Sequence, residues 1–131
     1  MNGSPAIESG PARRKAQLIV DAAQDKQAED IVALDVRELS SFADTFVIAT
    51  GNSDRHVRSI VDGIEAALAA NGEAPLGVEG REEGRWVLMD LNDAIVHVFV
   101  RDVRAHYDLE RLWGDAPELE LGSGVVGRSA P

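Results

Sequence analysis

Residues 86–100, WVLMDLNDAIVHVFV, are the most informative stretch of the chain. They contain two runs rich in valine, isoleucine and aromatic residues, which are residue types enriched in β-strands. Asn92 and Asp93 stand between the runs, and both residue types tolerate the positive φ of a tight turn. The stretch therefore predicts a β-hairpin with strands over residues 86–91 and 94–100.

A two-residue loop also fixes which residues face each other across this hairpin. It pairs Leu88 with His97, and the neighbouring pairs follow from the same alignment. Because side chains alternate along a strand, the hairpin has one face that is apolar throughout. The residues of this apolar face are Val87, Met89, Leu91, Ala94, Val96 and Val98. The opposite face, called the mixed face below, carries Trp86, Leu88, Asp90, Ile95, His97 and Phe99.

The apolar face must pack against helices, but the mixed face allows two interpretations. The first is a second core layer in which His97 and Asp90 are hydrogen-bonded, since buried polar groups usually have partners. The second is an exposed docking face, because tryptophan and other large aromatic residues anchor protein interfaces. Under the second interpretation, Trp86→Ala abolishes partner binding and leaves the fold intact.

The rest of the chain supplies elements of both kinds. In chain order, the predicted elements are a helix over residues 11–28, strands over 31–36 and 44–50, a helix that is capped by Asn52 or Ser53 and ended by Asn71-Gly72, the hairpin, and a helix over 101–113. A loop rich in glycine and charged residues is expected over 77–85. The order α-β-β-α-β-β-α predicts an α/β fold, a single-domain sandwich with a mixed β-sheet flanked by helices.

The two ends of the chain differ from its middle in composition. Residues 1–10 are rich in Gly, Ser, Pro and Ala, and residues 115–131 are acidic and then rich in Gly and Ser. Both ends are expected to be flexible, which leaves one domain over residues 11–114. The sequence has no cysteine, no signal-peptide pattern and no apolar run long enough to cross a membrane, so we expect a cytoplasmic protein without a membrane partner.

The charge of the chain bears on its partners. Of 131 residues, 23 are acidic and 13 are basic, which gives a formal net charge of −10. Nucleic-acid binders gain much of their affinity from cations placed on phosphates, so we expect no direct DNA binding and little direct RNA contact. An acidic surface instead suits a basic protein partner, through electrostatic steering and charge complementarity.

Two further features of the sequence are candidates for binding or chemistry. Residues 51–54, GNSD, join a predicted strand to a predicted helix, where free helix amides either bind an anion or are simply capped. The glycine spacing of a phosphate-binding loop is missing there.

The three histidines, His56, His97 and His106, lack the spacing of zinc ligands, so no metal or other cofactor is expected.

The predicted last helix is dense in aromatic and charged side chains. Leu109 and Leu112 are expected to cover the sheet. Tyr107 and Trp113 fit two interpretations, since each ring carries a polar group that suits either the edge of a core or an interface with a partner.

Several motifs occur in a fixed order along the chain. They are Asp35 with SSFADxFVIATGNS at residues 40–53, EG at 79–80 with WVLMD at 86–90, VHVF at 96–99, and YxLExLW at 107–113. In this order and spacing they closely resemble the ribosomal silencing factor family, also called the Iojap family. The resemblance covers roughly residues 16–113.

This resemblance implies a small α/β domain of nucleotidyltransferase-like topology with a tendency to form homodimers when free. It also implies binding to the large ribosomal subunit through a ribosomal protein on its intersubunit face, the fourteenth of the large-subunit series. Bound there, members of the family stop the small subunit from joining and lower translation when nutrients are scarce. The partner-binding candidates that match family positions are Trp86, Leu88, Asp90 and His97 in the hairpin, and Tyr107 and Trp113 in the last helix.

Two alternatives to a translational repressor stay open. A metal-dependent nucleotidyltransferase-like enzyme needs a Gly-Ser type turn before a helix, which residues 51–53 imitate, and a strand with two alternating carboxylates. Residues 90–92, DLN, offer only one carboxylate, and two-metal phosphoryl transfer needs several acidic ligands, so the chain is expected not to be an enzyme. The other alternative is a dimerisation module of another assembly.

Overall fold

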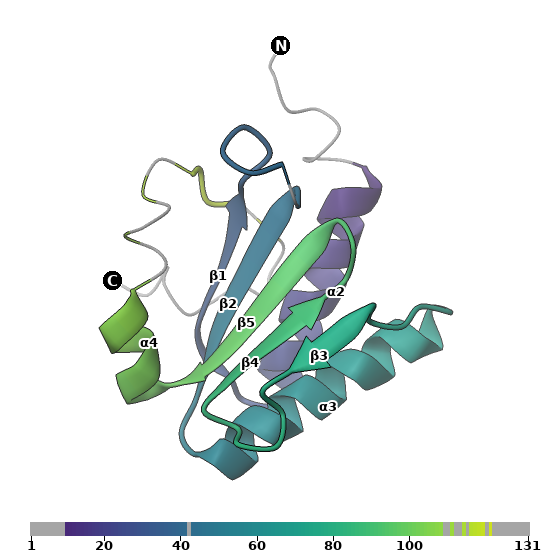
Figure 1. The fold of residues 1–131 in the computed structure, drawn as a ribbon. Coiled ribbons are helices and arrows are strands. Elements are labelled where there is room, and N and C mark those ends of the chain that lie inside the picture. The colour runs from purple at the N-terminus through teal and green to yellow at the C-terminus, as the bar shows by residue number, and fades with distance from the viewer. Residues whose placement is uncertain are drawn as a thin grey trace.

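The computed structural model describes residues 10–41 and 43–108, together with residues 111, 114, 116–119 and 121. Its helices and strands, labelled in Figure 1, are α2 (Pro11–Asp25), β1 (Glu29–Asp35), β2 (Thr45–Gly51), α3 (Asp54–Ala70), β3 (Gly77–Glu79), β4 (Trp86–Asp90), β5 (Ala94–Val100) and α4 (Arg101–Tyr107). No helix in this part of the chain is long and apolar enough to cross a membrane.

The strands form one mixed sheet in the order β1-β2-β5-β4-β3. β2 and β5 run parallel, and the other neighbouring strands run antiparallel. Helices α2 and α3 pack together on one face of the sheet, while α4 directly follows β5 (Figure 1). The predicted fold class, an α/β sandwich with a mixed sheet flanked by helices, is confirmed.

Helix α3 shows how the local sequence produces this architecture. Its buried residues recur at helical spacing and are Val57, Ile60, Val61, Ile64 and Leu68. Of the two predicted caps, Ser53 is the one used: its hydroxyl accepts a hydrogen bond from the backbone N–H of His56 at 3.1 Å. The helix ends before Gly72, whose φ of 75° lies in the left-handed region that favours glycine.

The sheet separates two hydrophobic cores. The larger core lies between the sheet and helices α2 and α3, and it includes all six residues of the hairpin's apolar face. The smaller core lies on the opposite face and contains Phe46, Phe99 and the β1 residues Val32 and Leu34. Trp86 packs at its margin. The predicted packing of the apolar face against the helices is therefore confirmed.

Strand β3 corrects the prediction of a loop over residues 77–85. Gly77–Glu79 pair antiparallel with β4, with Val78 beside Met89, so the order of elements is α-β-β-α-β-β-β-α. Three residues with a single large apolar side chain are too few to show an alternating pattern. The strand exists because the backbone of β4 is available for pairing, which is a long-range property.

Helix α4 is shorter than predicted. It ends at Tyr107 because Asp108 takes a left-handed conformation with a φ of 48°, and the N–H of Asp108 bonds to the carbonyl of Arg104 at 2.7 Å. The prediction of one continuous helix over residues 101–113 is therefore wrong. Leu109 and Leu112 lie outside the described residues.

The chain beyond α4 returns to the β1 edge of the sheet. The N–H of Asp35 donates to the carbonyl of Pro117, and the N–H of Leu119 donates to the carbonyl of Ala33, both at 2.8 Å. Leu119 is buried in the larger core. Residues 117–119 thus pair with β1, where the sequence predicts flexibility from residue 115 onward. Residues 1–9 and 122–131, for which flexibility is also expected, lie outside the described part of the chain.

Candidate functional site

The hairpin has the register that the sequence predicts. Leu88 lies opposite His97, and the pairs on either side follow the same alignment. The turn closes through a hydrogen bond from the N–H of Leu91 to the carbonyl of Ala94 at 2.9 Å, with Asn92 at a φ of 80°. The six residues of the mixed face therefore point to the side of the sheet away from α2 and α3.

The mixed face is more deeply buried along β5 than along β4. On β5, Phe99 is fully buried and His97 is only 6% exposed. On β4, Trp86, Leu88 and Asp90 each remain partly exposed, and we call these three residues the exposed patch. The mixed face is therefore neither wholly core nor wholly exposed, and docking of a partner on it stays a prediction. On the β5 side, His97 and Phe99 belong to the core and Ile95 is partly buried, whereas the three β4 residues all reach the surface.

A group of rings packs beneath the exposed patch. The ring centroid of Trp86 lies 5.0 Å from that of Phe99. The ring of Phe46 meets that of His97 edge to face at 5.3 Å, and His97 stacks on Phe99 with 7° between the two planes. Aromatic rings attract one another at these separations, so Trp86 rests on a well-packed support.

A hydrogen bond between Trp86 and His97 determines which ring nitrogen of the histidine carries the proton. The indole N–H of Trp86 donates to Nδ1 of His97 at 3.1 Å. An indole nitrogen can only donate, so Nδ1 is unprotonated and the neutral ring carries its proton on Nε2. Burial lowers the pKa of His97 to about 4, which also favours the neutral ring near pH 7. Nε2 has no hydrogen-bond partner among the described residues.

Asp90 and His97 have separate hydrogen-bond partners. The carboxylate of Asp90 accepts from the backbone N–H of Asn92 at 3.0 Å and stabilises the hairpin turn. The two side chains are therefore not hydrogen-bonded to each other in the structure.

The four partner-binding candidates of the hairpin, Trp86, Leu88, Asp90 and His97, lie on one face of the sheet. The side chain of Tyr107, the last residue of α4, lies outside the described part of the chain, as does the whole of Trp113.

Sequence reasoning missed one residue that shapes the exposed patch. Gly80 has a φ of 86°, and a Cβ at this position would lie 2.2 Å from the carbonyl oxygen of Trp86. Only glycine allows the chain to pass this close to the start of β4. The motif Glu79-Gly80 contains the signal, but its contact with Trp86 depends on the pairing of β3 with β4.

The loop after Gly80 is tied to the helix layer. Arg81 forms ion pairs with Asp62 at 2.5 Å and with Glu65 at 2.6 Å. Arg58 donates to the backbone carbonyl of Glu82 at 3.0 Å. These contacts link the segment that precedes Trp86 to α3.

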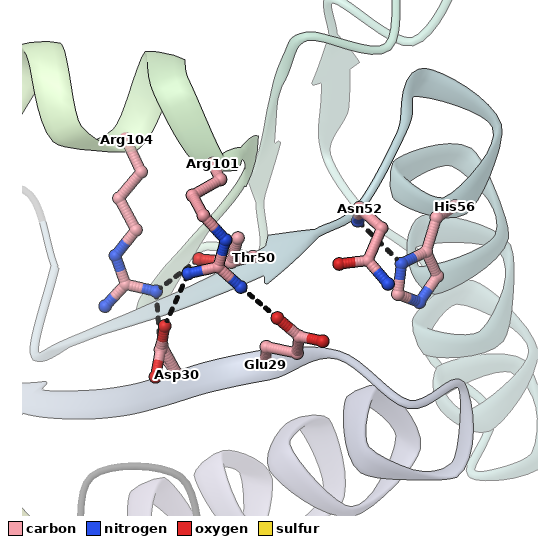
Figure 2. Close-up of polar contacts among 7 residues, drawn as sticks. All are labelled: Glu29, Asp30, Thr50, Asn52, His56, Arg101 and Arg104. Carbon is pink, nitrogen blue, oxygen red and sulfur yellow. Dashed lines mark hydrogen bonds and ion pairs between the residues drawn. The ribbon is translucent and has the colours of Figure 1, made fainter.

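A second polar cluster attaches α4 to the sheet (Figure 2). Arg101 pairs with Glu29 and, at 3.0 Å, with Asp30. Arg104 is buried, and it donates to Oγ1 of Thr50 at 2.7 Å and to the backbone carbonyl of Asp30. Asp30 has a φ of 50° and lies where the β1–β2 register shifts, which turns its carbonyl toward Arg104. This cluster holds α4 against β1 and β2.

The junction at residues 51–54 is a helix cap. Besides the Ser53 cap, Nδ1 of His56 accepts from the backbone N–H of Asn52 at 2.8 Å, as Figure 2 shows. Nε2 of His56 lies 2.8 Å from the carbonyl oxygen of Lys26, so the junction is also joined to the end of α2. Across the described residues, no group of three His, Asp or Glu side chains is placed to hold a metal ion.

The sheet register places the two features that a nucleotidyltransferase-like enzyme would need, the turn at residues 51–53 and the carboxylate of Asp90, far apart. Gly51 lies beside Val100 in the parallel β2–β5 pair. Asp90 lies opposite Ile95, which is beside Phe46, at the other end of β2. At about 3.3 Å per residue, roughly 17 Å separates the two levels along the strand. The glycine-containing turn and the carboxylate of Asp90 therefore do not form one site.

The fold and the site together define a class of protein. An acidic α/β domain presents a partly exposed tryptophan on a packed aromatic support, on the sheet face opposite its helix layer. Aromatic anchors of this kind are typical of protein-binding domains.

Comparisons with known proteins identify the family. A family model described as ribosomal silencing factor during starvation matches residues 9–130. The chain is 49% identical over 109 residues to the ribosomal silencing factor of Bacillus subtilis, an alignment that covers 83% of this chain and 92% of the relative. A crystal structure of a Chromobacterium violaceum protein matches with a TM-score of 0.76 and 35% identity, covering 91% of this chain and 96% of that one. The chain belongs to the ribosomal silencing factor family.

A more distant relative comes from the mouse. It is named mitochondrial assembly of ribosomal large subunit protein 1 and is 25% identical over 119 residues, which are 85% of this chain and 52% of the mouse protein.

Proposed function

We propose that this protein binds the large ribosomal subunit and represses translation. Its contact is a ribosomal protein on the intersubunit face, the fourteenth of the large-subunit series, and its bulk prevents the small subunit from joining. Translation falls as a result when nutrients are limited. The observation that carries the proposal is the exposed patch, in which Trp86, Leu88 and Asp90 lie on a sheet face that α2 and α3 leave open.

The exposed patch has the chemistry of an interface centre. Trp86 and Leu88 supply apolar area, and Asp90 supplies a carboxylate beside them. The net charge of −10 favours a basic partner, and ribosomal proteins are generally basic. A micromolar complex needs about 8 kcal/mol of binding free energy, which a compact aromatic anchor with charged surroundings supplies.

A steric mechanism suits this architecture because it needs rigidity and bulk rather than a reactive group. The sheet is backed by two helices, and residues 117–119 pair with its β1 edge. When the exposed patch contacts the large subunit, the helix layer faces outward, where the small subunit would dock. We infer no catalytic step and no metal or cofactor for this function.

In the absence of ribosomes, we infer a cytoplasmic homodimer. An apolar patch at a protein surface favours association with a second copy when its partner is absent. Light scattering coupled to size-exclusion chromatography measures the mass directly. We expect the mass of two chains, and a mass of one chain at every concentration contradicts this inference.

Two assays with purified ribosomal subunits test the proposal. In co-sedimentation, large subunits are expected to retain the wild-type protein and to lose Trp86→Ala. Leu18→Ala, which truncates a partly buried side chain of α2, is the matched control and is expected to bind normally. In a subunit-joining assay, the wild type lowers the fraction of full ribosomes and Trp86→Ala does not. Normal binding by a folded Trp86→Ala, or normal joining in the presence of bound wild type, overturns the proposal.

A further inference from the structure

We propose that His97 is a positioning residue for docking of the exposed patch, and that it acts on the partner only through Trp86. This inference rests on the proposed function. His97 is a predicted contact residue, but only 6% of its surface is exposed, so it offers the partner almost no area of its own. What it does contact is the anchor, since its Nδ1 accepts the indole N–H of Trp86 at 3.1 Å.

A histidine at position 97 is energetically unfavourable for folding. Because Nδ1 accepts from Trp86, the ring proton lies on Nε2, which is buried without a partner in the described part of the chain. A buried donor without a partner opposes folding, and a leucine or phenylalanine would fill the same place without this cost. The feature that only the histidine offers is an acceptor for the indole N–H.

This acceptor selects one orientation of the indole ring. Trp86 is the first residue of β4, and its ring packs against Phe99 at 5.0 Å. Packing against an apolar ring does not distinguish the two edges of an indole, whereas a directional N–H···N bond turns the polar edge inward. The partner then meets carbon atoms of the ring, so the pocket that receives Trp86 is apolar. An anchor held in its binding orientation also loses less entropy on docking.

A double-mutant cycle with purified large subunits tests this inference. His97→Leu removes the acceptor, and we expect it to weaken binding roughly two- to tenfold, the range for freeing one ordered side chain. In a Trp86→Phe background, which has no indole N–H, the same substitution is expected to leave the affinity unchanged. An equal loss of affinity in both backgrounds overturns the inference, because His97 would then act without Trp86.

Two further variants separate positioning from a structural role. His97→Asn places an amide oxygen near the former position of Nδ1 and is expected to recover most of the affinity. Thr45→Val is the matched control, because it removes another buried polar atom that lacks a partner among the described residues and lies two strands from Trp86. We expect His97→Leu to unfold at no lower temperature than the wild type. Failure of His97→Asn to recover binding, or a loss of affinity that matches a loss of stability, contradicts positioning.

Fluorescence reports on the ring without the ribosome. The chain has two tryptophans, so Trp113→Phe leaves Trp86 as the only emitter. In that background, time-resolved anisotropy is expected to show fast ring motion in His97→Leu and not with His97 or Asn at this position. The two proposals fail in different ways. Normal binding by Trp86→Ala overturns the proposed function, whereas loss of binding by Trp86→Ala with wild-type binding by His97→Leu overturns only the role of His97.

Discussion

The two faces of the β4–β5 hairpin belong to the same strands but differ in composition and in burial. The apolar face holds only aliphatic residues and a methionine, all buried against α2 and α3. The mixed face adds an indole, an imidazole and a carboxylate, and its β4 side remains partly exposed. A fully covered face contributes packing alone, whereas an exposed tryptophan on a packed support can bind another protein. In this domain, the candidate binding surface forms where the helix layer is missing.

Neighbouring residues on opposite faces give the largest expected contrast. Met89 is fully buried, so Met89→Ala is expected to lower the free energy of unfolding by about 2–5 kcal/mol through lost contacts and a cavity. Leu88→Ala in the exposed patch is expected to lower it by about 1 kcal/mol and to weaken large-subunit binding about tenfold. Chemical denaturation and co-sedimentation measure the two effects. If Leu88→Ala is the more destabilising variant, the two faces do not differ as described.

The pH dependence of stability tests the mixed face alone, because only this face carries a histidine. Burial lowers the pKa of His97 to about 4, from 6.5 for an ordinary histidine, so the unfolded chain binds more protons between these values. Protonation of His97 therefore does not affect the free energy of unfolding above about pH 7. As the pH falls from there toward 4, it lowers the free energy of unfolding by about 3 kcal/mol. Denaturation of the wild type and His97→Asn across this range isolates the effect, since the carboxylates are common to both. Parallel pH profiles would show that His97 is not buried as a neutral group.

Much of the fold is predictable because it depends on local pattern. The hairpin register follows from a two-residue loop, and the faces of β4 and β5 follow from alternation. The start of α3 follows from a capping serine. Strand β3 and the end of α4 are not predictable in this way. The first depends on pairing with β4, and the second on the left-handed conformation of the single residue Asp108.

The sequence predicts which residues share the mixed face, but it does not predict which of them are exposed to solvent. Alternation, together with the register set by the two-residue loop, places Trp86, Leu88, Asp90 and His97 on one face. Which of them reach the surface depends on the smaller core, where Phe46 of β2 and residues of β1 pack beside β5. Those contacts are long-range, so the sequence leaves both interpretations of the mixed face open, and the structure settles only which side chains are buried.

Two glycines at either end of β3 test how the start of β4 is placed. Gly80→Ala is expected to lower the free energy of unfolding by about 2 kcal/mol, because a Cβ there meets the carbonyl oxygen of Trp86 and φ is positive. It is also expected to weaken large-subunit binding by displacing Trp86. Gly77→Ala is the matched control, since a Cβ at Gly77 meets nothing within 4 Å, and its effect is expected to stay within about 0.5 kcal/mol. Equal effects of the two variants on denaturation and binding would remove Gly80 from the site.

The smallest expected effect concerns the ion pairs of Arg81 with Asp62 and Glu65 on α3. Arg81 and Glu65 are partly exposed and Asp62 is exposed, so Arg81→Gln is expected to lower the free energy of unfolding by less than about 1 kcal/mol, and by less still at high salt. Binding is expected to change less than about twofold, because backbone pairing of β3 and the close approach of Gly80 hold the start of β4 without these charges. Denaturation at low and high salt, with co-sedimentation alongside Gly80→Ala, measures both quantities. A larger loss of binding in Arg81→Gln than in Gly80→Ala would mean that charge, rather than backbone geometry, sets the position of Trp86.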